Sequence, residues 1–168
     1  QMEITPVSIV RETLEVNLLG GFRVTQAFLP MLRKAKGRIV FTGSISGISP
    51  YPGMTAYAAS KCGIEGMAES LRVELRPFGI KVSVIEPGII HTDIWAKSDA
   101  ILEKIRKGAD PETYSLYEVP IQAYIKKRNA GRKHLQPEAV AEKACHAFTA
   151  RKPANHYLVG PDAKIVSF

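Results

Sequence analysis

The chain has 168 residues, of which 45% are hydrophobic and 23% charged, and its formal net charge is +7. This composition is typical of one globular domain with a sizeable core and excludes a disordered or fibrous chain. No apolar run approaches the roughly 20 residues that cross a bilayer, so we expect no integral membrane segment. The basic residues are scattered without interleaved aromatic side chains, which argues against nucleic acid as a partner.

The two cysteines, Cys62 and Cys145, have neither the number nor the spacing of a disulfide framework or a metal site. Both lie in apolar, helix-like stretches, which predicts reduced packing residues in a cytoplasmic protein. His134, His146 and His156 share no metal-ligand spacing, so no metal site is expected. No signal peptide is visible, and because the chain begins with Gln1 rather than Met, we expect the native N-terminus to lie further upstream.

The first predicted element is a long helix over about residues 5–32, with Thr5 as a cap and Pro6 in its first turn. The stretch 38–43 is short, β-branched and apolar, which predicts a strand buried on both faces. Glycine, proline and serine dominate the following segment, residues 44–54, and indicate turns.

A second long helix fits residues 55–76, and the apolar stretch 81–88 predicts another buried strand. Residues 92–135 are polar and mixed in pattern, which favours short helices joined by loops. A third helix over 137–150 and a strand over 156–160 complete the pattern. Alternating helices and apolar strands predict an α/β fold with a doubly wound parallel sheet, in which ligands bind beyond the carboxyl ends of the strands.

Tyr57 and Lys61 lie four residues apart in the second helix and therefore on one face of it. A nearby ammonium stabilises phenolate, which makes a tyrosine a usable general acid or base. By itself this spacing is common, and a packed tyrosine beside a solvated lysine is the alternative. Ser44 at the end of a buried strand and the amide of Asn17 within an apolar part of the first helix favour the catalytic interpretation.

Together these features resemble the short-chain dehydrogenase/reductase family, over about residues 16–92. The resemblance lies in five motifs in the order and spacing of that family: VNLLG, GRIVFTGS, Ser44, YAASK and IEPGIIHT. It implies the Rossmann-like form of the doubly wound sheet and a cofactor that is NAD or NADP.

The resemblance also implies roles for the matching residues. Tyr57 would be the general acid or base, and Lys61 would stabilise its phenolate and hold the ribose of the nicotinamide, so that both residues contact the cofactor. Ser44 would orient and polarise the substrate oxygen. Asn17 would anchor a water that links Lys61 to solvent in a proton relay.

Four residues after the second strand match the part of the family that lines the nicotinamide. They are Pro87, Gly88, Ile90 and Thr92. Ile90 would contribute its backbone groups, and Thr92 would contribute its hydroxyl to the carboxamide side of the ring.

The Gly-rich turn and the NNAG-like element with which the family opens are not found in this chain. That turn cradles the pyrophosphate, and the residue ending the family's second strand selects NAD or NADP, so the sequence does not distinguish the two cofactors. We expect residues 1–168 to form a single, incomplete domain that lacks the N-terminal part and binds cofactor poorly by itself. Residues 93–135 correspond to the variable substrate lid.

The implied function is an oxidoreductase that interconverts a secondary alcohol and a ketone or aldehyde by hydride transfer. Residues 74–88 and 92–95 resemble the branch that includes retinol and hydroxysteroid dehydrogenases, which implies a bulky apolar substrate. The alternatives are a non-catalytic relative used for binding or regulation and an inactive fragment. The family commonly pairs its two long helices between subunits, so a homodimer or homotetramer is expected.

Overall fold

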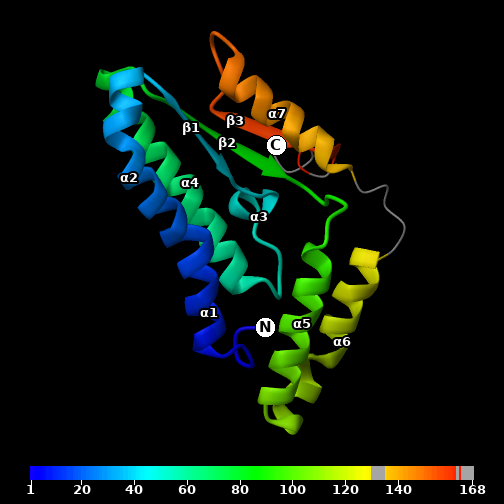
Figure 1. The fold of residues 1–168 in the computed structure, drawn as a ribbon. Coiled ribbons are helices and arrows are strands. Elements are labelled where there is room, and N and C mark those ends of the chain that lie inside the picture. Colours follow the sequence, from blue (N-terminus) through cyan, green and yellow to red (C-terminus); the bar gives the residue numbers. More distant parts are fainter. Residues whose placement is uncertain (130–134, 162, 164–168) are drawn as a thin grey trace.

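The computed structural model describes residues 1–129, 135–161 and 163. Within these residues, three parallel strands form one sheet in the order β1–β2–β3 (Figure 1). The strands are β1 (Arg38–Thr42), β2 (Lys81–Pro87) and β3 (His156–Val159). The α/β architecture with a parallel sheet is therefore confirmed, and the three strands lie within one residue of their predicted ends.

Helices cover both faces of the sheet. The helical elements are α1 (Val7–Leu14), the π-helical turn η1 (Glu15–Leu19), α2 (Gly20–Ala35), α3 (Ile45–Ile48), α4 (Thr55–Leu75), the 3-10 turn η2 (Arg76–Phe78), α5 (Ile94–Gly108), α6 (Pro111–Asn129) and α7 (Pro137–Thr149). Figure 1 shows α2 and α4 on one side of the sheet and α7 on the other, with α5 and α6 beyond the carboxyl end of β2. No helix among the described residues has the length and apolarity needed to span a bilayer.

Alternate residues of the strands point into two separate apolar layers, as a sheet covered on both faces requires. On one face, Ile39, Phe41, Val82 and Val84 pack with Ile64, Ala68 and Leu75. On the other face, Ile85, Tyr157 and Val159 pack with Ala147 of α7. Burying one large aliphatic side chain in such a layer contributes about 1.5–3 kcal/mol, so these layers hold the strand ends in place.

The first long helix, predicted over about residues 5–32, is continuous but not a regular α-helix. Residues Glu15–Leu19 form a π-helical turn around Asn17, in which the N–H of Gly20 donates to the carbonyl of Glu15. Such turns inserted into α-helices are frequent at functional sites. The helix ends at Ala35, a little later than predicted, where Lys36 takes a left-handed conformation with φ of 48°.

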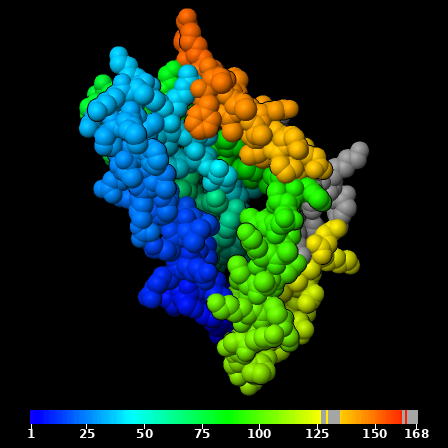
Figure 2. Space-filling model, viewed as in Figure 1, coloured from blue at the N-terminus to red at the C-terminus, as the bar shows by residue number. Residues whose placement is uncertain are grey.

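The region after β2 differs most from its prediction. Instead of several short helices, its described residues form the long helices α5 and α6, and residues 130–134 lie outside the described part of the chain. The pair packs on the N-terminal segment through a buried cluster of Ile4, Ile9, Ile105 and Ile121. In Figure 2 the pair forms a green-to-yellow lobe beside the blue N-terminal helix. The isoleucines are distant in sequence, so the local pattern did not reveal this packing.

The cysteine prediction is half correct. Cys62 and Cys145 are both free thiols, as expected, but both are exposed rather than packed in the core. The Cys62 thiol lies on the side of α4 that meets α3 and donates to the carbonyl of Gly47 at 3.2 Å. The apolar residues of α4 that reach the core lie on a different part of the helix, which is why an apolar context alone misplaced this thiol.

Two glycines give a matched test of the packing between α4 and the sheet. A Cβ at Gly43 would lie 2.7 Å from Glu65 Oε1 and 2.7 Å from Val84 Cγ1, whereas a Cβ at Gly66 would meet no atom within 4 Å. We expect Gly43→Ala to lower the free energy of unfolding by about 1–3 kcal/mol through overpacking. Gly66→Ala, in the middle of α4, should raise it by about 0.5–1 kcal/mol.

Urea denaturation of the two variants and the parent chain provides the measurement. A Gly43→Ala variant as stable as the parent would show that the carboxyl end of β1 is not tightly packed against α4.

Candidate active site

Tyr57 and Lys61 both lie in the first two turns of α4, which begins at Thr55. The predicted proximity of the two side chains is confirmed, because Lys61 Nζ is 5.7 Å from the centroid of the Tyr57 ring. Both residues are half-buried. A cation at this distance from an aromatic ring is attracted to its face. The pair is therefore a structural unit and not two unrelated surface residues.

Lys61 joins α4 to the carboxyl end of β1. Its Nζ donates a 2.8 Å hydrogen bond to the carbonyl of Thr42, the last residue of that strand. Burial lowers the pKa of Lys61, and the nearby negative charge of Glu65 partly opposes this shift. An ammonium has three N–H donors, so the bond to Thr42 leaves donors for further oxygens at the strand end.

Asn17 is connected to the same part of α4 by hydrogen bonds. Its Nδ2 donates to Ser60 Oγ at 3.1 Å, and Ser60 Oγ donates to the carbonyl of Tyr57 at 2.7 Å. Ser60 is completely buried. A Cβ at Gly63 would lie 2.8 Å from Leu18 Cδ2, so the π-helical turn packs closely on α4 one turn from Ser60. The π-helical turn thereby holds Asn17 beside the segment that carries Tyr57 and Lys61.

Ser44 lies two residues after Thr42, at the point where the chain leaves β1 and begins α3. It is buried, and its Oγ accepts a 3.1 Å hydrogen bond from the N–H of Ser46 as the cap of α3. A hydroxyl offers one donor and two acceptor positions, so Ser44 can still donate to another oxygen. Ser46, the neighbouring serine, supplies the backbone group that holds Ser44 in place.

The residues matched to the nicotinamide region lie beyond the carboxyl end of β2. Pro87 ends the strand, and the N–H of Gly88 donates to the carbonyl of Val159 at 2.9 Å, which continues the pairing with β3. The carbonyl of Ile90 accepts a 3.2 Å hydrogen bond from the indole of Trp95. One backbone group of Ile90 that the resemblance assigned to the cofactor is thus engaged within the chain.

Thr92 is exposed in the loop between β2 and α5. Because β1 and β2 are adjacent and parallel, the residues that follow them lie at the same edge of the sheet. The structure links Asn17, Tyr57 and Lys61 by direct contacts and chains of hydrogen bonds. Ser44 and the residues after β2 lie at the same edge of the sheet because they follow two adjacent parallel strands.

Two supporting residues were not assigned roles from the sequence, namely Thr42 and Ser60. Ser60 lies between Tyr57 and Lys61 in the chain, and its position on the buried side of α4 could have indicated a bridging role. Thr42 acts through its backbone carbonyl, which no side-chain motif reveals. A groove of about 360 Å³ borders this region along β1, and its lining includes Asn17, Gly21 and Thr42.

The sequence and fold are similar to those of known oxidoreductases. The sequence model of the family described as short chain dehydrogenase matches residues 1–102. An uncharacterized oxidoreductase, YusZ, of Bacillus subtilis (strain 168) is 35% identical over 166 residues, which cover 98% of this chain and 58% of that protein.

Two named dehydrogenases are also similar. The human 17-beta-hydroxysteroid dehydrogenase type 1 is 38% identical over 151 residues, covering 89% of this chain and 45% of that protein. Retinol dehydrogenase 16 of Mus musculus is 37% identical over 158 residues, which cover 90% of this chain and 49% of that protein. The chain thus spans about half the length of the relatives that it matches.

Solved structures show the same fold. A short-chain dehydrogenase from Streptomyces avermitilis superimposes with a TM-score of 0.73 at 27% identity, covering 98% of this chain and 57% of that one. A short chain dehydrogenase from Burkholderia cenocepacia, solved in complex with NADP, has a TM-score of 0.69 at 22% identity, covering 96% and 54%. At this identity the second structure supports the fold alone.

The half-buried charge of Lys61 gives a prediction about stability. At neutral pH folding partly removes this ammonium from water in exchange for one backbone hydrogen bond, the face of the Tyr57 ring and the charge of Glu65. Such groups are retained at functional sites at a cost in stability. We expect Lys61→Met to raise the free energy of unfolding by about 0.5–1.5 kcal/mol. Lys97→Met, at an exposed position of α5, should change it by less than about 0.5 kcal/mol.

Chemical denaturation at pH 7 distinguishes the two variants. A Lys61→Met protein that is clearly less stable than the Lys97→Met protein would mean that Lys61 is a net stabilising residue.

Proposed function

Because the chain belongs to the short-chain dehydrogenase family, we propose that it carries the proton-transfer residues of an oxidoreductase that uses NAD or NADP. The reaction is the interconversion of a secondary alcohol with a ketone or aldehyde. The observation that carries this proposal is the arrangement of Tyr57 and Lys61, with the Lys61 ammonium bonded to the carbonyl of Thr42 at the carboxyl end of β1. A solvated surface lysine would not be half-buried at a strand end.

In the oxidative direction, Tyr57 accepts the proton of the substrate hydroxyl, and in the reductive direction its phenol returns that proton to the carbonyl oxygen. The Lys61 ammonium stabilises the phenolate form by electrostatic attraction. Ser44 donates its hydroxyl hydrogen to the substrate oxygen and so aligns it with Tyr57. When bound, the nicotinamide cofactor supplies or accepts the hydride.

The proton that Tyr57 accepts must leave the site before the next turnover. We assign its exit to Lys61 and to a water held near Asn17. The hydrogen bond from Asn17 to Ser60 supports this assignment, because it places the amide at the π-helical turn beside the segment that carries both catalytic residues.

The residues present fit the nicotinamide and ribose end of the cofactor. Lys61 has N–H donors left for the ribose hydroxyls, and Tyr57 lies beside it. Pro87, Gly88 and the exposed hydroxyl of Thr92 lie at the adjacent strand end, where the nicotinamide would bind. No Gly-rich turn for the pyrophosphate occurs in the sequence. These residues therefore account for the nicotinamide end of the cofactor and not for its pyrophosphate.

We assign the substrate lid to α5 and α6, which extend from the end of β2. Tyr124 of α6 donates to Met54 Sδ at 3.6 Å, and its ring centroid lies 6.1 Å from that of Tyr51. These contacts bring α6 to the loop that precedes Tyr57. Aromatic and apolar side chains at this position suit a bulky apolar alcohol, such as a steroid-like or retinoid alcohol, as the names of two relatives also indicate.

We further propose a cytoplasmic location. Cys62 and Cys145 are both exposed and free, and unpaired surface thiols persist where glutathione and thioredoxin keep them reduced. Recovery of a tagged protein in the cytoplasmic fraction would support this location.

Tyr57→Phe tests the mechanism in the protein that carries this chain. Removing the phenolic hydroxyl should lower kcat by about 10²–10⁴-fold, which is the usual contribution of general acid–base catalysis. Cofactor binding should stay nearly unchanged, because the aromatic ring and Lys61 remain. Cofactor oxidation or reduction with a secondary alcohol or ketone, followed by absorbance, provides the measurement.

Tyr157→Phe is the matched control, since its hydroxyl contacts His146 and the N–H of Ala154 on the α7 side of the sheet and its loss should leave kcat nearly unchanged. Full activity of the Tyr57→Phe enzyme would contradict the acid–base assignment. Cofactor binding by the parent protein without turnover on any alcohol would favour the non-catalytic relative.

We also propose that the protein forms a homodimer or homotetramer through its long helices. Several large apolar side chains of α2 are about half exposed, including Phe22 (53%), Phe28 (52%) and Met31 (57%). A second copy of the same surface would remove this apolar area from water, as in an isologous interface.

A charge on this surface should dissociate the oligomer. We expect Phe28→Glu to shift the sedimentation coefficient towards that of a monomer, because a carboxylate would be buried without a partner. Phe148→Glu, on α7 with a similar exposure of 53%, is the control and should leave the assembly intact. A monomeric parent protein would refute this proposal.

A further inference from the structure

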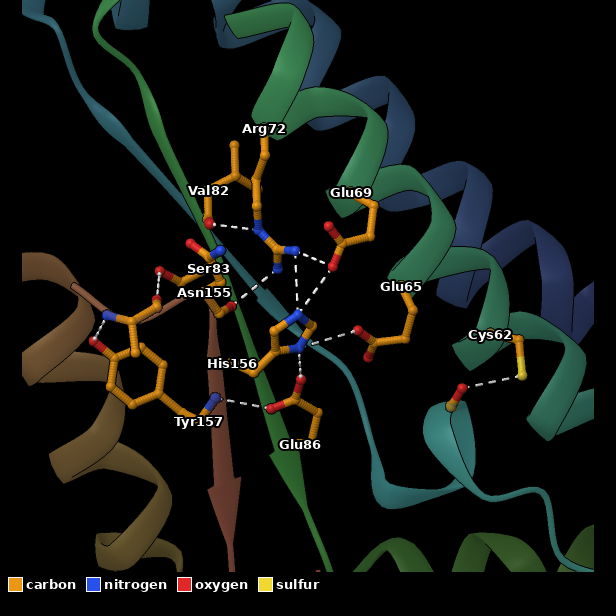
Figure 3. A network of polar contacts seen from close by, with 12 residues as sticks. Cys62, Glu65, Glu69, Arg72, Val82, Ser83, Glu86, Asn155, His156 and Tyr157 are labelled. Atoms are coloured by element: carbon orange, nitrogen blue, oxygen red, sulfur yellow. Dashed lines mark hydrogen bonds and ion pairs between the residues drawn. The ribbon is translucent and has the colours of Figure 1, made fainter. Parts of the chain in front are cut away.

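A second cluster of charged side chains lies between α4 and the sheet, outside the candidate active site (Figure 3). Helix α4 contributes Glu65, Glu69 and Arg72, which share one face of the helix. Strand β2 contributes Glu86 and β3 contributes His156. Nothing in the proposed proton transfer uses this cluster.

His156 lies among three carboxylates. Its Nδ1 is 2.5 Å from Glu86 Oε1, and its Nε2 is 2.9 Å from Glu69 Oε1. Glu65 Oε2 is 3.8 Å from the same Nδ1. Burial lowers the pKa of His156, but the hydrogen bonds to Glu86 and Glu69 outweigh it, so that the pKa is raised. With Arg72 as the other cation, carboxylates outnumber positive groups in the cluster.

Glu65 is the carboxylate of this cluster whose oxygens accept no hydrogen bond from the described part of the chain. Both of its carboxylate oxygens are buried, and neither has a hydrogen-bond partner among the described residues. Burial, together with the charge of Glu86, raises the pKa of Glu65 to about 7. A buried carboxylate without a hydrogen bond is costly, so the retention of Glu65 calls for a ligand or a proton.

We propose that Glu65, Glu86 and His156 bind a divalent transition-metal cation such as Zn²⁺. One carboxylate oxygen of each glutamate and one ring nitrogen of His156 lie within 4.8 Å of one another. Zn²⁺ takes these ligand types at about 2.0–2.2 Å, which places neighbouring ligand atoms about 3–3.5 Å apart. Small side-chain movements of Glu65 and His156 would therefore close the site.

Metal binding replaces the proton on His156 by the metal ion. The proton on His156 Nδ1, now bonded to Glu86, is released to solvent, and the nitrogen lone pair becomes a metal ligand. Glu65, whose ion pair with His156 is long at 3.8 Å, then gains a closer positive partner. The His156 side chain is 41% exposed, so a cation can reach the cluster from solvent.

The surrounding contacts orient these ligands as the outer shell of a metal site does. His156 Nε2 lies 2.9 Å from Glu69 Oε1 and 3.2 Å from a terminal nitrogen of Arg72. Glu69 would accept the Nε2–H after Nδ1 binds the metal. Glu69 forms an ion pair with Arg72. Glu86 is completely buried, and its Oε2 accepts a 2.9 Å hydrogen bond from the N–H of Tyr157, so that Oε1 is directed at the site.

Arg72 is itself held by the backbone. Its Nε donates to the carbonyl of Val82 and a terminal nitrogen donates to that of Asn155, both at 3.0 Å. The acidic residues are therefore part of a fixed arrangement on β2, β3 and α4, which differs from a group of solvated surface glutamates.

Calorimetric titration of the chain with ZnCl₂ tests the proposal. We expect one equivalent of Zn²⁺ to bind, with the affinity reduced at least about 10-fold in Glu65→Gln and in His156→Asn. Glu74→Gln is the matched control, because Glu74 lies exposed on the same helix and should leave the affinity unchanged. Circular dichroism shows whether each variant is folded. If His156→Asn does not fold, the isosteric Glu65→Gln still tests the proposal.

Replacing Zn²⁺ by Co²⁺ identifies the ligands. Visible d–d bands of bound Co²⁺, without a thiolate-to-cobalt charge-transfer band in the near ultraviolet, support the proposal if these d–d bands are lost in Glu65→Gln. A thiolate band would assign the metal to Cys62 or Cys145 and overturn it. Absence of Zn²⁺ binding to the parent chain, or equal affinity in the Glu65→Gln variant, would overturn it as well.

Discussion

The packing of α4 against the sheet is the contact on which the rest of the molecule depends. Ile64 and Ala68 are almost completely buried there, at 2% and 0% exposure. Because residues three and four apart share a face of a helix, burying these two also brings Lys61, Glu65 and Arg72 to the sheet. Charged groups in that position must find polar partners or lose stability. The polar contacts of both sites follow from this requirement.

The charged residues in the two halves of α4 find polar partners in different ways. Near its N-terminus, the Lys61 ammonium binds the backbone carbonyl of Thr42 and keeps donors for other oxygens. One turn later the charges are mainly negative, and His156 and Arg72 partly balance them. Glu65 acts on both regions, because its charge also opposes the lowering of the pKa of Lys61. A cation bound to Glu65 would offset that charge, which couples the two regions electrostatically.

The regular elements could be predicted from the sequence because apolar periodicity is a local property. Helix α4, the three strands and α7 all lie within about two residues of their expected ends. The π-helical turn could not be predicted, since the contact of Asn17 that it supports is with Ser60, 43 residues away. The length of α5 and α6 was missed for the same reason, because Ile105 and Ile121 pack on Ile4 and Ile9.

The sequence by itself determined the family and the pairing of Tyr57 with Lys61, because motif order and helical spacing are written along the chain. Only the tertiary structure decided which groups these residues meet: the Thr42 carbonyl for Lys61 and Ser60 for Asn17. It also brought Glu65, Glu86 and His156 together from three separate elements, although histidine spacing predicts no metal site. A charged residue within the apolar strand β2, Glu86, was the one local sign of this cluster. Contacts of this kind depend on how helices and strands pack, and no local pattern encodes that packing.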